Sequence, residues 1–263
     1  MVISMSSSEY AIETHQLTKK YKSKGITILA LDNLNLQIKQ GEIYGLLGEN
    51  GAGKTTFVRA ATTMIRPTFG TVSVLGLDSI TNSERVRNLV GVLPQDAGLY
   101  EEFSVWENLF YFTKLHNIEN PEQHVRELID LVEMSDRVHQ RADSLSGGLK
   151  RRVCLARTLI GHPKVIFLDE PTTGLDVLVS RKVRSLIQKL ASSSHATVVL
   201  STHNMFEAEK ICTKVGILHK GHLIAEDTPT NIVERYRTNP TENLEDVVAH
   251  MIGYDQNGNR GSE

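Results

Sequence analysis

Short apolar runs without charged residues recur along the chain and predict its buried strands. They lie at residues 43–47 (IYGLL), 90–93 (VGVL), 165–168 (VIFL) and 197–200 (TVVL). Runs of this length are typical of parallel strands that are covered on both faces. Residues 27–38 instead alternate partly between apolar and polar side chains, which predicts antiparallel strands with one wet face within residues 10–44.

Helical periodicity appears mainly between the second and third of these runs. It marks the segments 104–116, 121–134 and 149–161, and Pro121 fits the first position of a helix that Asn120 would cap. A further helix is expected over 205–214, and a strand–turn–strand over 215–226 around Lys220-Gly221. The pattern therefore predicts an α/β core that is interrupted by a helical insertion.

Composition is ordinary for a soluble globular protein and excludes little. The 263 residues are 40% hydrophobic and 23% charged, and the formal net charge of -2 gives no general attraction to nucleic acid. Cys154 and Cys212 have no nearby partner, and we expect both to be buried in a reducing compartment. No apolar run approaches the ~20 residues that span a bilayer, and the N-terminus does not read as a signal peptide. We therefore expect a cytosolic protein that reaches a membrane only through another subunit.

Residues 48–55 (GENGAGKT) fit the phosphate-binding pattern G-x-x-x-x-G-K-[ST]. They follow a predicted strand and precede a helical segment, which is the context that this pattern requires. Glycines let backbone N–H groups surround the β-phosphate at a helix N-terminus. Lys54 is expected to reach the β- and γ-phosphates, and the Thr55 hydroxyl to bind Mg²⁺. The alternative is a plain Gly-rich turn. The nucleotide-binding residues predicted here are Gly48, Asn50, Gly51, Ala52, Gly53, Lys54, Thr55 and Thr56.

Polar residues also follow the other three apolar runs. Asp169 and Glu170 end one run, where two carboxylates are costly unless a cation or hydrogen bonds compensate them. We expect Asp169 to hold Mg²⁺ indirectly and Glu170 to polarise the attacking water; a surface turn is the alternative. His203 is expected to contact the γ-phosphate or that water, and Gln95 to bind Mg²⁺ or hold water. Because ligands of open α/β sheets bind outside the carboxyl ends of the strands, these strand ends predict one shared site.

One segment contradicts the usual rule for charges on helices. Residues 145–152 (LSGGLKRR) open a predicted helix with two glycines, followed at once by Lys150, Arg151 and Arg152. The helix dipole disfavours cations at an N-terminus. Within one isolated chain this arrangement has no evident purpose.

Six motifs follow one another within residues 10–235: GENGAGKT, PQ, LSGG, VIFLDEP, GLD and STH. In this order of motifs the chain resembles the ATP-binding subunits of ABC transporters. The LSGG segment before VIFLDEP separates this pattern from other families with a phosphate-binding loop. The resemblance implies an α/β fold: a RecA-like P-loop NTPase core, an antiparallel β subdomain and an inserted α-helical subdomain. It also implies an ATPase domain (9–240) followed by a C-terminal helix with a polar tail (241–263). The Ser-rich composition of residues 1–8 separately predicts a disordered N-terminus. Within the ATPase domain, the core would comprise 9–95 and 157–240, and the helical subdomain 96–156.

The resemblance further implies that two such domains, identical or merely related, sandwich two Mg-ATP molecules head to tail. Ser146, Gly147 and Gly148 would bind the γ-phosphate held by the opposite subunit, and Asp176 of GLD would cross the interface. Tyr21 resembles the aromatic residue that stacks on adenine, although an isolated Tyr among lysines is usually half-buried core. The three cations after LSGG would add to the positive field toward the partner's ATP, with solvent-facing side chains as the alternative for at least two of them.

Leu149 departs from the family pattern, which commonly has Gln there, but Ser146 and both glycines remain, so ATP hydrolysis is still expected. Residues 243–253 (NLEDVVAHMIG) resemble a segment of ABC-2-like exporters of drugs, antibiotics or Na⁺; an ordinary amphipathic helix is the alternative. The resemblance thus implies an ATPase that drives a separate permease, at the inner face of the cell membrane and without a nucleic-acid partner.

Two other functions are less consistent with the sequence. A soluble ABC ATPase acting on ribosomes or DNA is disfavoured by the single cassette, the lack of sustained heptads and the lack of basic excess. A P-loop kinase would leave LSGG and STH unexplained.

Overall fold

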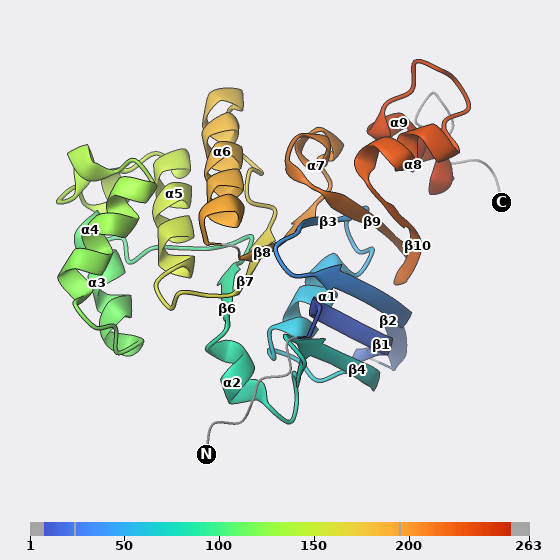
Figure 1. Cartoon of the computed structure of the whole chain (residues 1–263), viewed down its shortest axis with the longest axis horizontal. Coiled ribbons are helices and arrows are strands. Elements are labelled where there is room, and N and C mark those ends of the chain that lie inside the picture. Colours follow the sequence, from blue (N-terminus) through green and yellow to red (C-terminus); the bar gives the residue numbers. More distant parts are fainter. Residues whose placement is uncertain (1–7, 24, 195, 254–263) are drawn as a thin grey trace.

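The chain is described by a computed structural model that covers residues 8–23, 25–194 and 196–253 (Figure 1). The expected disorder of the first residues and the expected polar tail fall almost entirely outside these ranges. The strands form a six-stranded sheet, in the order β10-β9-β3-β8-β7-β6, and a four-stranded sheet, in the order β2-β1-β4-β5. With the helices, they give the α/β fold class predicted from the sequence.

The centre of the six-stranded sheet consists of the four predicted apolar runs. β3 (Ile43–Leu47), β8 (Thr197–Thr202), β7 (Val165–Asp169) and β6 (Val90–Leu93) are parallel neighbours. Every residue of β3, β7 and β8 is buried, as expected for strands covered on both faces. Because these strands are parallel, their carboxyl ends lie at the same edge of the sheet.

The other two strands extend the sheet beyond β3. β9 (Lys214–His219) runs parallel to β3, and β10 (His222–Asp227) pairs antiparallel with β9 at the edge. The predicted strand–turn–strand is therefore confirmed.

The four-stranded sheet is antiparallel and has one wet face. It contains β1 (Tyr10–Ser23), β2 (Ile26–Lys39), β4 (Phe69–Val74) and β5 (Leu77–Asp78). From Leu34 to Lys39, buried and exposed residues alternate along β2, as the sequence pattern predicts. Helix α1 (Lys54–Ala61) packs against both sheets, and its buried Phe57 belongs to a core cluster that joins them.

The helical insertion lies beside the β6 edge of the large sheet (Figure 1). It contains α3 (Val105–Leu115), α4 (Pro121–Leu131) and α5 (Gly147–Thr158), with 3₁₀ turns at Ser135–Arg137 and Ala142–Ser144. Pro121 occupies the predicted first helical position. Asn120 occupies the predicted N-cap position and its carbonyl accepts from the His124 N–H at 3.1 Å, but it adopts a left-handed φ of 52° and its side chain makes no capping hydrogen bond.

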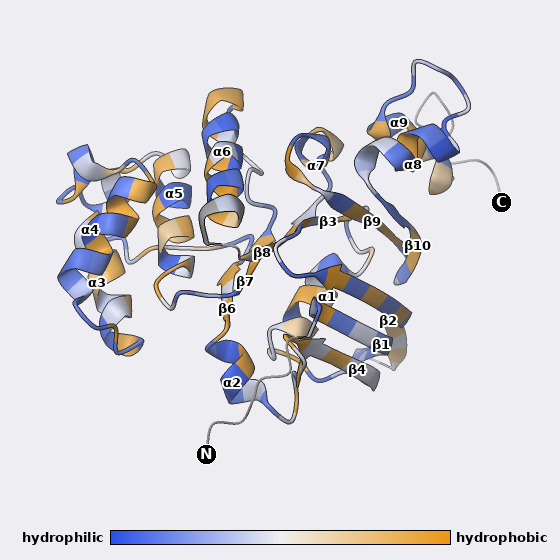
Figure 2. Ribbon diagram, viewed as in Figure 1, coloured by the Kyte–Doolittle hydropathy of each residue, from blue (hydrophilic) through white to orange (hydrophobic). Residues whose placement is uncertain are grey.

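Five further helices complete the part of the chain that the structure describes, including α2 (Ser83–Arg87), α7 (Met205–Ile211), α8 (Pro229–Tyr236) and α9 (Leu244–Met251). The fifth, α6 (Val177–Ser194), is long, yet the sequence pattern did not single it out. The outer helices alternate hydrophobic and hydrophilic residues, whereas the central strands are hydrophobic (Figure 2). Within the described ranges, no helix combines the length and hydrophobicity needed to cross a bilayer. Cys154 and Cys212 are buried free thiols, and burial raises the pKa of both.

Gly91 of β6 offers a test of how α5 packs on the sheet. A Cβ atom at Gly91 would lie 2.3 Å from the Thr158 carbonyl oxygen at the end of α5, and that backbone has little freedom to move. We expect Gly91→Ala to lower the free energy of unfolding by about 1–3 kcal/mol, measured by urea denaturation. Gly98→Ala is the matched control, because nothing lies within 4 Å of its Cβ position. Equal stability of the two variants would contradict this packing.

Candidate functional site

The loop between β3 and α1 has backbone positions that accept only glycine. Gly48 has φ 151°, and a Cβ atom there would lie 2.2 Å from the Leu218 carbonyl oxygen. Gly53 has φ 115°, and a Cβ atom there would lie 2.5 Å from the Ala30 carbonyl oxygen. The loop therefore packs backbone against backbone and leads directly into the N-terminus of α1, where the first N–H groups have no partner within the helix.

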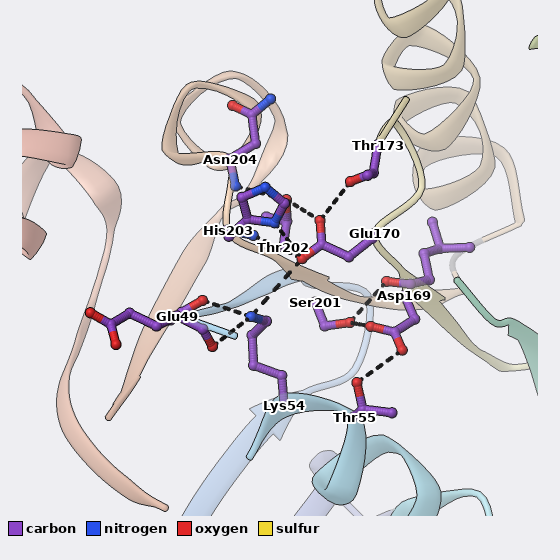
Figure 3. Close-up of polar contacts among 12 residues, drawn as sticks. Glu49, Lys54, Thr55, Asp169, Glu170, Thr173, Ser201, Thr202, His203 and Asn204 are labelled. Atoms are coloured by element: carbon purple, nitrogen blue, oxygen red, sulfur yellow. Dashed lines mark hydrogen bonds and ion pairs between the residues drawn. The ribbon is translucent and has the colours of Figure 1, made fainter. Parts of the chain in front are cut away.

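Lys54 keeps this loop curled. Its ammonium Nζ donates hydrogen bonds to the carbonyl oxygens of Gly48, at 2.6 Å, and Glu49, at 3.2 Å. Burial lowers the pKa of Lys54, while the nearby Glu170 and Asp169 carboxylates oppose this shift. The cation thus lies inside the loop, next to the two acidic residues that end β7 (Figure 3).

The loop and the strand ends enclose a cleft of about 130 Å³. Gly48 and Ala52 do not line it. Gly48 lies against Leu218, and the Ala52 carbonyl accepts a hydrogen bond from the Gly221 N–H. The lining residues are Ala30, Glu49, Asn50, Gly51, Gly53, Lys54, Thr55, Thr56, Gln95, Asp169 and Glu170.

Three side chains in this cleft supply the oxygen atoms that Mg²⁺ prefers. The Thr55 hydroxyl donates to Asp169 Oδ2 at 3.2 Å, and Asp169 Oδ1 accepts a hydrogen bond from Ser201 (Figure 3). The exposed Gln95 amide lines the same cleft from the end of β6. Mg²⁺ usually takes one or two carboxylates from the protein and fills its other coordination positions with water and phosphate oxygens. One carboxylate and two neutral oxygen-bearing side chains suit such an ion. The residues therefore fit Mg²⁺.

Glu170 is held in a strained and almost fully buried position. It is only 5% exposed and has a left-handed φ of 48°, which is uncommon for a side chain of this kind. Its N–H donates to the Ser201 carbonyl at 2.9 Å, so the turn after β7 is tied to β8. Backbone strain of this sort persists where the surrounding structure fixes it.

Four hydrogen bonds orient the Glu170 carboxylate. Oε1 accepts from the His203 N–H at 3.1 Å and lies 2.7 Å from His203 Nδ1, and Lys54 Nζ is 4.0 Å away. Oε2 accepts from the hydroxyls of Thr173, at 2.9 Å, and Thr202, at 3.4 Å. Figure 3 shows these side chains converging on Glu170.

The hydroxyl groups around the two carboxylates were not predicted from the sequence. Ser201 and Thr202 precede His203 in STH, and Thr173 ends the segment DEPTT that begins with Asp169 and Glu170. Their position beside two buried acids is the signal that could have indicated them, because a buried carboxylate requires donors.

The predicted partner-facing residues lie outside this cleft. Ser146 precedes α5 and is exposed, as is Gly147, and Asp176 caps α6 by accepting a hydrogen bond from the Val179 N–H at 2.9 Å. A Cβ atom at Gly148 would lie 2.5 Å from Val179 Cγ1. The starts of α5 and α6 are therefore side by side. Tyr21 on β1 does not line the cleft either, and the Lys19 ammonium lies 5.1 Å from its ring centroid.

The three cations after LSGG all bind within their own chain. Lys150 pairs with Glu101 at 2.9 Å, and Arg152 donates to the Val132 carbonyl at 2.9 Å. The Arg151 guanidinium donates to five carbonyls, those of Pro94, Gln95, Asp169, Glu170 and Pro171. Arg151 is therefore not a solvent-facing side chain, and its contribution to a field toward a partner's ATP stays a prediction. Leu149 packs partly buried against the larger core cluster, which accounts for an apolar residue there.

Comparison with known proteins places these features in one family. Residues 31–173 match the family model described as ABC transporter. The bacitracin transport ATP-binding protein BcrA of Bacillus licheniformis is 34% identical over 86% of this chain and 72% of its own length. A Nod factor export ATP-binding protein I of Rhizobium meliloti is 36% identical over 88% of this chain and 71% of its own length.

A solved structure agrees with these relatives. A dimeric ATP-binding cassette in a post-hydrolysis state, bound to ADP and phosphate, matches with a TM-score of 0.75 and 26% identity. The match covers 82% of this chain and 98% of that one. The family model, the relatives and the shared fold agree, and the chain belongs to the ABC transporter family as an ATP-binding, ATP-hydrolysing subunit.

Proposed function

We propose that Glu170 is the general base of ATP hydrolysis in this subunit. The observation that supports this role is the Glu170 carboxylate itself: it is buried, fixed by four donors, and 4.0 Å from the Lys54 ammonium that curls the phosphate-binding loop. A carboxylate held this firmly can orient a water molecule and accept its proton during attack on the γ-phosphate. His203, half-exposed beside it, contacts the γ-phosphate or that water.

The nucleotide is held by the loop and by Mg²⁺. In the proposed complex, Lys54 lies at the β- and γ-phosphates, and the remaining loop residues surround them with N–H groups. Thr55 and Gln95 bind the Mg²⁺ ion, and Asp169 holds it indirectly. The ion neutralises charge on the phosphates when it is bound. Tyr21 stacks on the adenine. It lies on β1, which pairs with β2, and Ala30 of β2 lines the cleft.

A second ABC ATPase subunit completes the site, as a copy or a relative of this chain. The cleft of about 130 Å³ is small beside the ~300–1,000 Å³ of ordinary ligand pockets, so a nucleotide would extend beyond it. The adjacent starts of α5 and α6 expose Ser146, Gly147 and Asp176 together with the apolar Val177 and Leu178. In a head-to-tail dimer, Ser146, Gly147 and Gly148 bind the partner's γ-phosphate, and Asp176 crosses the interface.

The proposed cellular role is export through a separate transmembrane permease. The relatives above are named for bacitracin transport and Nod factor export. By analogy, this subunit works in the cytoplasm, peripherally at the inner face of the cell membrane, and ATP binding and hydrolysis close and open the dimer. A role on ribosomes or DNA has no comparable support, since the formal net charge is -2.

The role of Glu170 can be tested by Glu170→Gln. The amide preserves size but cannot accept the proton of water, so ATP binding is expected to remain while kcat falls at least about 100-fold, within the range typical of general bases. Nucleotide titration and steady-state ATPase assays measure the two quantities separately. Sedimentation with ATP should show a trapped dimer. Unchanged steady-state turnover would sink the assignment.

The role of Ser146 in a partner's site can be tested by Ser146→Arg. Because Ser146 does not line its own chain's cleft, ATP binding by the monomer should be unchanged, while a long side chain there blocks ATP-induced dimerisation. Sedimentation with ATP is the measurement. Ser192→Arg, the same substitution near the far end of α6, should dimerise normally. An intact ATP-dependent dimer of the Ser146 variant would refute the role.

A further inference from the structure

Glu207 is a buried acid that the proposed reaction leaves unused. It lies on α7, one turn after His203, and is 0% exposed. Its N–H donates to Asn204 Oδ1 at 3.1 Å as part of the helix cap. Neither carboxyl oxygen has a hydrogen-bond partner of good geometry among the described residues. A buried ionised carboxylate in this condition would be costly, so the surroundings favour a neutral carboxyl group.

The groups nearest Glu207 belong to the two segments that orient the catalytic carboxylate. The hydroxyls of Thr172 and Thr202 approach it and oppose the rise in its pKa, although burial outweighs them and raises that pKa overall. Thr202 is the residue that donates to Glu170 Oε2 at 3.4 Å. Thr202 therefore stands between Glu207 and the proposed general base.

Among the described residues, no cation forms an ion pair with Glu207. The charged and titratable groups that act on it are Arg184 on α6, Arg151 on α5, Glu170 after β7 and Cys212 at the end of α7. Arg151 binds backbone carbonyls, and the Arg184 guanidinium lies 5.5 Å from the ring centroid of Phe206. Neither comes within 4.0 Å of the Glu207 carboxyl oxygens in an ion pair within the described ranges.

We propose that Glu207 is a positioning residue of the ATPase site, a neutral carboxyl group whose O–H bonds the Thr202 hydroxyl and thereby directs the Thr202 proton to Glu170. This role rests on the proposed function of Glu170. A hydroxyl has one donor and two acceptor positions. Thr202 Oγ1 already accepts from the Asn204 N–H at 3.0 Å, which leaves one acceptor position for Glu207.

The direction of these hydrogen bonds decides the outcome. A neutral Glu207 donates to Thr202, and the single Thr202 proton then goes to Glu170. An ionised Glu207 could only accept, so it would compete with Glu170 for that proton and place a second negative charge beside it. The neutral form therefore supports an oriented Glu170 carboxylate, and the ionised form would loosen it.

The kinetic test compares Glu207→Gln with Glu207→Leu in the full-length chain. Gln keeps a donor and an acceptor, so kcat should stay within about twofold of the native value. Leu removes the donor, and kcat should fall about tenfold while the KM for ATP changes less than about twofold, because phosphate binding lies elsewhere. Glu209→Gln is the matched control, an exposed acid on the same helix whose Oε1 accepts from the Leu244 N–H, and its kcat should be unchanged.

A second test measures the charge of Glu207 through stability. The pKa of Glu207 is raised in the folded state. Above the ordinary value of 4.5 the unfolded chain therefore ionises while the folded chain stays neutral, and the penalty to folding grows with pH until the raised pKa is reached. Glu207→Gln removes this penalty. The melting temperature of the Gln variant should therefore rise relative to the native protein as the pH increases from about 4 to 7. A difference that does not change with pH would overturn neutrality.

The results separate failure of this role from failure of the proposed base. Equal loss of kcat in the Gln and Leu variants would show that a carboxylate is required, and native kcat in the Leu variant would show that no group is required; either result overturns the proposal for Glu207. If Glu170→Gln keeps its turnover, the general base itself is misassigned, whatever the Glu207 variants do.

Discussion

The Arg151 guanidinium fixes the geometry on which the site depends. It donates to the carbonyls of Pro94 and Gln95 beyond β6, and to those of Asp169, Glu170 and Pro171 at the end of β7. Strand ends that turn away from the sheet lose their ladder partners, and each buried carbonyl left unpaired costs about 1–3 kcal/mol. A planar group with five N–H donors can satisfy several such carbonyls at once, which an ammonium cannot. Arg151 therefore joins the first turns of α5 to the end of β6, which carries Gln95, and to the end of β7, which carries Asp169 and Glu170.

This contact also explains the charges at the start of α5. The helix dipole disfavours cations there by about 0.3–1 kcal/mol each, which is less than the cost of several unpaired carbonyls. Lys150 and Arg152 likewise bind Glu101 and the end of α4. The three cations thus attach one helix to three neighbouring segments. The same helix begins just after Ser146, so the exposed LSGG segment and the backbone of Glu170 are joined through the first turns of α5.

The sequence predicted those parts of the structure that local pattern determines. Uncharged apolar runs located β3, β6, β7 and β8, and the requirement for parallel strand ends at one edge brought Lys54, Gln95, Asp169 and Glu170 to one cleft. Tertiary contacts determined the rest. Helix α6 was missed because it begins with the exposed Val177 and Leu178, although Val183, Leu186, Ile187 and Leu190 have helical spacing. Neither the carbonyl partners of Arg151 nor the burial of Glu207 leaves any local signal, because their neighbours are distant in sequence.

The arrangement of buried and exposed groups supports a division of labour between two chains. Glu170 as the proposed general base, its donor Thr202 and the proposed Mg²⁺-holding Asp169 are buried and held by hydrogen bonds, so one chain fixes them before any partner arrives. Ser146, Gly147 and Asp176 are exposed and lie outside that cleft. In the proposed dimer, phosphate binding belongs to one chain and closure over the γ-phosphate to the other. Hydrolysis would then require both, because a rigid base gains its substrate geometry only when the second chain excludes water and completes the contacts to the γ-phosphate.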